Sequence, residues 1–191
     1  MIRIVWIAVM FLFAGTVTQE LKAQHIGFGV RAGTQLSNIP QLDVNTLVGY
    51  HFGGYYQYQI KDKWMVEPAI MYSQKGIKDK LNYTTHYHTD RFKYLDVPVL
   101  LKYNVTGDFD LIAGPQASLF LFRSSGYGSE RETSKEAVKG YDLAGVLGLG
   151  YHGLPFGLNL QATAEFGVID TNYTDQSGKN QLFRFSVGKS F

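Results

Sequence analysis

The chain has 191 residues, no cysteine, and 18 Lys and Arg against 16 Asp and Glu, which gives a net charge of +2. This near balance argues against nucleic acid as a partner. The lack of cysteine excludes disulfides, thiolate metal ligands and a lipoprotein anchor. A chain of this length normally folds as one domain, and no linker or low-complexity segment divides it.

The first segment has the pattern of a secretory signal peptide. Arg3 precedes an apolar run over residues 4–17, which is shorter than the roughly 20 residues that a membrane-spanning helix needs. Polar residues follow, and Ala23 suits the last position before a cleavage site. We therefore predict a signal peptide over residues 1–23 and a mature domain over residues 24–191; a short buried helix is the alternative.

Later segments alternate apolar and polar residues, which predicts strands with one oily and one wet face. In the last of them, Phe183, Phe185, Val187 and Phe191 share one face. The eight predicted strands cover residues 25–36, 46–60, 64–76, 92–105, 109–122, 141–153, 156–169 and 183–191. Short turns at 61–63, 104–108 and 152–155 alternate with long polar connections at 37–45, 77–91, 123–140 and 170–180.

This alternation of short turns and long loops is typical of membrane barrels. The wet faces are rich in glycine, which suits a crowded lumen, and the oily faces carry aromatic residues near strand ends. A soluble barrel of the lipocalin type would instead turn its oily face inward. We expect an all-β protein of the cell outer membrane of a Gram-negative bacterium, an eight-stranded antiparallel up-and-down transmembrane β-barrel surrounded by outer-membrane lipid.

Phe191, the last residue, resembles the C-terminal aromatic residue that outer-membrane barrels use as an assembly signal. The resemblance implies that the barrel-assembly machinery is a partner during biogenesis.

Charged residues on the wet faces balance in sign. An isolated charge in a narrow lumen would be costly, and an eight-stranded interior is about wide enough for side chains to fill. We therefore predict that these residues form ion pairs that plug the lumen, with Glu67 next to Lys102 and Glu165 next to Arg184. The competing interpretation is an acid/base catalytic pair. The eight lumen residues are Arg31, Glu67, Lys75, Asp96, Lys102, Asp142, Glu165 and Arg184.

The long loops hold residues suited to contact a partner or a surface glycan. These candidates are Tyr83, His86, Tyr87, His88, Arg91, Tyr127 and Arg131. His86, His88 and Asp90 also have the residue types of a Zn²⁺ or Cu²⁺ site, but a plain solvated loop is the expectation, so we predict no metal. His51 and His152 lie on wet faces and are expected to hydrogen-bond inside the barrel.

No nucleophile motif, phosphate-binding loop or dinucleotide fingerprint occurs in the sequence. We predict no catalytic residue and no cofactor.

Two stretches resemble the PorT-like outer-membrane β-barrel family of Bacteroidota. One is the strand from Trp64 to Gly76, with its Glu-Pro pair and its Tyr-Ser-x-Lys-Gly sequence, and the other runs from Tyr94 to Tyr103. An Ala-Gly-Pro sequence that ends at Pro115 opens a fifth strand of the same kind. The chain departs from the family at Glu165, where an Arg-Tyr pair is common. Pro68 and Pro98 lack an N–H for the strand ladder, so we expect bulges or bends there.

The resemblance implies the fold more than the activity. We predict a monomeric, non-enzymatic barrel with a structural or surface-interaction role through its long loops, and an unidentified surface ligand or secretion partner. The alternatives are a narrow pore for small solutes within the porin class, an accessory of a protein-secretion machine, and a lipid-modifying barrel enzyme.

Overall fold

The computed structural model describes residues 26–38, 45–80, 87–127, 130–134, 140–169, 171–173, 176–179 and 181–191. The predicted signal peptide, residues 1–23, lies outside these ranges. Within them, no helix has the length and apolar character needed to cross a membrane.

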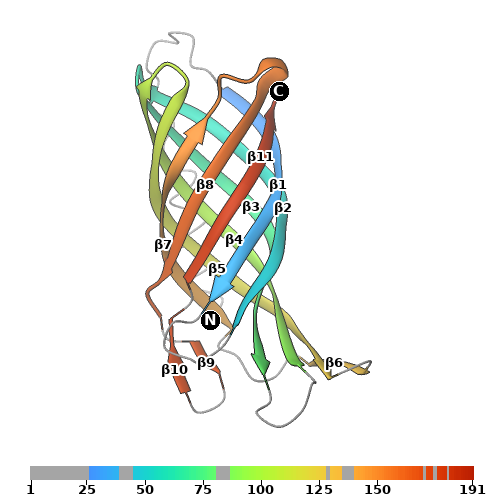
Figure 1. Ribbon diagram of the computed structural model, residues 1–191. Helices are drawn as coiled ribbons and strands as arrows, with labels where there is room; N and C mark the ends of the chain where they lie inside the picture. The colour runs from blue at the N-terminus through green and yellow to red at the C-terminus, as the bar shows by residue number, and fades with distance from the viewer. Residues whose placement is uncertain are drawn as a thin grey trace.

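Eight antiparallel strands close into one barrel, as predicted (Figure 1). Each strand pairs with the next along the chain, and β11 pairs with β1 to complete the circle. The barrel strands are β1 (Ile26–Asn38), β2 (Asn45–Lys61), β3 (Trp64–Lys80), β4 (Tyr87–Thr106), β5 (Phe109–Tyr127), β7 (Tyr141–Tyr151), β8 (Leu158–Gly167) and β11 (Gln181–Ser190).

The two faces of the barrel follow the alternation in the sequence. Outward positions are apolar and exposed, as at Phe28, Phe52 and Phe185. Inward positions are buried and mostly polar, as at Arg31, His51 and Arg184. This inside-out arrangement matches a barrel whose exterior contacts hydrocarbon.

The two ends of the barrel differ. The turn end, at the top of Figure 1, carries Phe191 and the short connections Asp62–Lys63, Gly107–Asp108 and 152–157. The loop end, at the bottom, carries β6 (Glu130–Ser134), which pairs with β5, and the hairpin of β9 (Thr171–Tyr173) with β10 (Gln176–Gly178).

One wall of the barrel extends farther at the loop end than the other. A tilted strand crosses a bilayer with about 9–11 residues. β8 and β11 have 10 residues each, whereas β4 has 20 and β5 has 19. The prediction of loops at 77–91 and 123–140 is therefore wrong in part, because polar residues in these segments continue the ladders of β3, β4, β5 and β6.

The turn end shows two local features. The seventh predicted strand begins at Leu158 rather than Phe156, because Pro155–Gly157 forms the short helix η1, in which Phe156 has a positive φ of 62°. Phe191 stacks on Phe28 with ring centroids 5.2 Å apart, and its backbone N–H donates to the carbonyl oxygen of Phe28 at 2.9 Å.

Pro68 and Pro98 do not mark bulges, which was one of the two predicted alternatives. The register of β3 with β4 is the same on both sides of Pro68, which lies opposite Val99. The bulges of the β4–β5 ladder fall instead at Lys93/Tyr94 and Asn104/Thr106. A proline costs the ladder one donor without forcing an extra residue into the strand.

Candidate functional site

All eight predicted lumen residues are buried inside the barrel. Seven of them form two groups joined by ion pairs. The central ring consists of Lys75, Asp96, Glu165 and Arg184, and the mouth layer, nearer the turn end, consists of Arg31, Glu67 and Lys102. The eighth residue, Asp142, is buried on β7 and interacts electrostatically with Lys75.

The central ring spans the lumen. Lys75 on β3 contacts Glu165 on β8 at 2.6 Å, and Arg184 on β11 contacts Asp96 on β4 at 2.5 Å. Each of these pairs joins strands on opposite sides of the eight-strand circle. Two further contacts, Lys75 to Asp96 at 3.6 Å and Arg184 to Glu165 at 3.0 Å, complete an alternating ring.

Neutral side chains hold the cations of the central ring in place. Arg184 Nε donates to Gln35 Oε1 at 3.0 Å and Nη1 donates to Gln116 Oε1 at 2.9 Å. Lys75 Nζ donates to Ser118 Oγ at 3.2 Å. Because the buried cations have several partners each, the ring is a connected network rather than a set of isolated charges. Asp96 Oδ1 and Glu165 Oε2 take part in it through ion pairs without a hydrogen bond.

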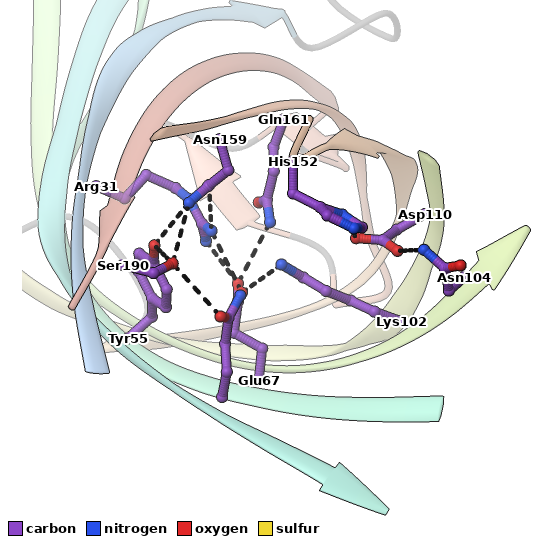
Figure 2. Close-up of polar contacts among 11 residues, drawn as sticks. Arg31, Tyr55, Glu67, Lys102, Asn104, Asp110, His152, Asn159, Gln161 and Ser190 are labelled. Atoms are coloured by element: carbon purple, nitrogen blue, oxygen red, sulfur yellow. Dashed lines mark hydrogen bonds and ion pairs between the residues drawn. The ribbon is translucent and has the colours of Figure 1, made fainter. Parts of the chain in front are cut away.

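The mouth layer centres on one carboxylate. Figure 2 shows Arg31, Lys102 and Gln161 converging on Glu67, which is fully buried. Arg31 Nη1 donates to Glu67 Oε1 at 2.5 Å, and Lys102 Nζ donates to Oε2. Gln57 donates to Oε2 at 2.9 Å, and Gln161 donates to Oε1 at 3.4 Å.

A pocket of about 600 Å³ opens at the turn end, beside the mouth layer. One of its walls carries Asp110, whose carboxylate accepts from Asn104 Nδ2 at 3.1 Å and lies 3.1 Å from His152 Nδ1 (Figure 2). Asn159 and Gln161 form another wall on β8. The lining of this turn-end pocket therefore combines polar groups with apolar side chains such as Trp64 and Leu160, and Lys102 of the mouth layer belongs to it.

A second cavity, of about 30 Å³, lies between the central ring and the mouth layer. It has room for about two water molecules. Arg31 and His51 line it, and Arg31 Nε and His51 Nδ1 have no protein partner. Water in this cavity would satisfy both atoms.

His51 also makes the one serine contact that resembles a catalytic pair in the described side chains. Its Nε2 lies 2.8 Å from Ser186 Oγ. No carboxylate hydrogen-bonds to Nδ1, and the adjoining cavity is too small for a substrate. The pair therefore fits a structural hydrogen bond. His152, the other histidine expected inside the barrel, lies at the partly exposed turn end.

The predicted loop candidates fall partly outside the described residues. Tyr83 and His86 lie outside them, so the metal candidate with His88 and Asp90 has no geometry to report. The backbones of the remaining candidates belong to the extended wall, which is the part of β3, β4, β5 and β6 at the loop end. Tyr87 pairs there with Lys80, and His88 pairs with Tyr127. Arg91 on β4 and Arg131 on β6 complete this set.

Sequence reasoning missed several residues of the site because it followed charge alone. The missed residues are uncharged carboxamides and one carboxylic acid at inward positions. The alternation of apolar and polar residues along each strand is the signal that could have identified them. They are Gln35, Gln57, Asn104, Asp110, Gln116, Asn159 and Gln161.

Comparisons with known proteins agree with the architecture. The family model described as outer membrane protein beta-barrel domain matches residues 19–173. Among solved structures, Neisserial surface protein A is similar with a TM-score of 0.57 and 14% identity, over 87% of this chain and 97% of that one. No curated protein matches the sequence.

The attachment invasion locus protein of Yersinia pestis, in complex with the heparin analogue sucrose octasulfate, is also similar. Its TM-score is 0.51 and its identity 15%, over 88% of this chain and 99% of that one. At these identities the structural likeness bears on the fold alone.

Proposed function

This chain belongs to the outer membrane protein beta-barrel domain family and is a protein of the outer membrane, and we propose that it is a sealed, non-enzymatic barrel that supports an interaction surface outside the cell. By the usual arrangement of such barrels, the turn end faces the periplasm and the loop end faces the exterior. The proposal has two parts, the seal and the surface.

The central ring is the observation that carries the seal. Its two shortest ion pairs cross between opposed strands, and all four side chains are at most 8% exposed. An eight-stranded barrel has little interior left once side chains of this size meet in the middle. A passage for solutes would require both crossing pairs to separate at once, which argues against the narrow-pore alternative.

Recording from planar bilayers tests the seal. The wild-type protein is expected to give no steady conductance, whereas replacing the seven residues of the central ring and the mouth layer together by serine is expected to raise it. The serine variant also serves as the control for insertion, because a current from it shows that the preparation enters the bilayer. A large steady conductance from the folded wild-type monomer would refute the seal.

The extended wall supports the surface part of the proposal. β3, β4, β5 and β6 form a continuous sheet that reaches beyond the short strands at the loop end (Figure 1). Tyr87, His88, Tyr127 and Arg131 belong to this projecting sheet, and Arg91 lies at its base. Sheet that continues this far past the short strands is more than a barrel needs to span a membrane.

Shortening the projecting sheet tests this role. A variant that replaces residues 124–134 by a tight turn is expected to fold but to lose capture of a surface component by crosslinking on whole cells. The matched control replaces the β9–β10 hairpin at the same end, residues 171–178, and is expected to keep that capture. Equal capture by both variants would argue against a surface role for the wall.

Finer assignments belong to the same proposal. The stretch from Tyr94 to Tyr103 supports the PorT-like branch of the family, and the position of Phe191 at the β1–β11 junction supports its part in assembly. We also propose a monomer with outer-membrane lipid around it. Gel filtration with light scattering in detergent checks that the protein is monomeric.

A further inference from the structure

The turn-end pocket is large enough to hold a ligand, and we propose that it binds a neutral saccharide with hydroxyl and acetamido groups from the periplasmic side. Its volume of about 600 Å³ lies within the range of small-molecule sites, about 300–1,000 Å³. The inference concerns the end opposite to the projecting sheet, so it does not depend on a surface role.

The charges that line the pocket cancel. Lys63 and Lys102 face Asp62 and Asp110 in its lining. Lys102 is in addition paired with Glu67, and Asp110 is hydrogen-bonded to Asn104 and lies next to His152. A charged ligand would gain little attraction here and would lose its hydration, so an uncharged ligand fits best.

Carboxamides dominate the polar lining. Five of them face the pocket, and each offers both donors and an acceptor. Asn159 and Gln161 are about 94% buried, which fixes their positions. The five residues are Gln57, Gln59, Asn104, Asn159 and Gln161.

Several hydrogen-bonding groups in the pocket retain capacity. The ammonium of Lys102 has three N–H donors, of which Glu67 takes one among the described contacts. The amide of Gln161 uses a donor on Glu67 while its oxygen accepts no described hydrogen bond. A ligand that both donates and accepts, as hydroxyl and acetamido groups do, satisfies these groups together.

Trp64, Met65, Leu158 and Leu160 also line the pocket, but its carboxamides disfavour an occupant that is apolar throughout. A lipid tail would remove water from the carboxamides without offering hydrogen bonds in return. The mouth layer closes the inner end, so a ligand enters and leaves through the turn end.

Binding of chitotriose, a neutral trimer of N-acetylglucosamine, tests the inference with the full-length protein in lipid nanodiscs. Isothermal titration is expected to show saturable binding. NMR shifts are expected at Gln161, Asn159 and Asp110, and none at the loop end.

Two variants locate the site by independent means. Gln161→Leu removes a donor and an acceptor, while Glu67 keeps Arg31, Lys102 and Gln57 as partners. Gly150→Leu places a side chain into the pocket, where a Cβ at Gly150 would lie 3.3 Å from Ile112 Cδ1. Each variant is expected to weaken chitotriose binding by about tenfold or more, which corresponds to about 1.4 kcal/mol.

The control is Gln181→Leu, a carboxamide at the loop end of β11, which is expected to bind chitotriose like the wild type. Absence of binding to the folded wild type would overturn the inference. So would binding that neither pocket variant weakens, or tighter binding of an acidic sugar or of a short acidic peptide than of the neutral trimer.

Discussion

The central ring and the mouth layer use the same kinds of side chain in different ways. In the central ring, two cations alternate with two carboxylates, and every carboxylate touches both cations. In the mouth layer, two cations share the single carboxylate of Glu67 beside an open pocket. A ring with shared partners therefore tolerates the loss of one group, whereas a layer built on one carboxylate depends on it.

The largest effect is expected from Glu67→Ala. This change leaves Arg31 and Lys102 buried without their shared counter-ion, which costs about 3–5 kcal/mol of unfolding free energy. Urea titration of the protein in lipid vesicles measures the loss. A loss no greater than that of Asp96→Ala in the central ring would contradict the idea that the mouth layer depends on one carboxylate.

A smaller loss is expected from Asp96→Ala in the central ring. Glu165 remains within 2.6 Å of Lys75 and 3.0 Å of Arg184, so both cations keep a carboxylate. The expected cost is about 1–3 kcal/mol. The same urea titration checks it, and a cost above that of Glu67→Ala would contradict the idea of shared partners.

Matched carboxamide variants sharpen the difference between the layers. Gln116→Leu removes the 2.9 Å hydrogen bond to Arg184 and is expected to cost about 1 kcal/mol. Gln161→Leu removes only a 3.4 Å contact to Glu67 and is expected to cost about half as much or less. Equal costs would show that Gln161 serves stability rather than the pocket.

A similarly small effect is expected when a whole ion pair is replaced. Lys75→Met together with Glu165→Gln removes one charge of each sign and leaves Asp96 paired with Arg184, while Asp142 loses its interaction with Lys75. The double variant is expected to unfold within about 1 kcal/mol of the wild type, while each single change costs more. Additive costs in this double-mutant cycle would mean that the two residues do not act as a pair.

Much of the fold follows from the sequence because strands alternate with a period of two. Phe183, Phe185 and Val187 point outward and Arg184 and Ser186 inward, as their order along β11 requires. The extension of β3 and β4 could not be predicted from the sequence. Lys78, Asp79 and Lys80 are all polar, so they do not show the alternation of apolar and polar residues that marks a strand. Backbone pairing with β4 continues β3 there.

The site could be predicted only in part. Glu67 and Lys102 lie in contact on neighbouring strands, and alternation together with strand order leads to such pairs. The contact of Arg31 with Glu67 skips a strand, and that of Lys75 with Glu165 crosses the lumen. These depend on the stagger and diameter of the closed barrel, which no local pattern in the sequence encodes.

The pairing of β1 with β11 has a consequence for biogenesis. Ten residues of each strand pair, from Gly29 with Ser190 to Asn38 with Gln181. Hydrocarbon does not tolerate unpaired backbone groups, so a half-synthesised chain has no stable resting place in the bilayer. The barrel therefore closes only once β11, the last strand along the chain, is available to pair with β1.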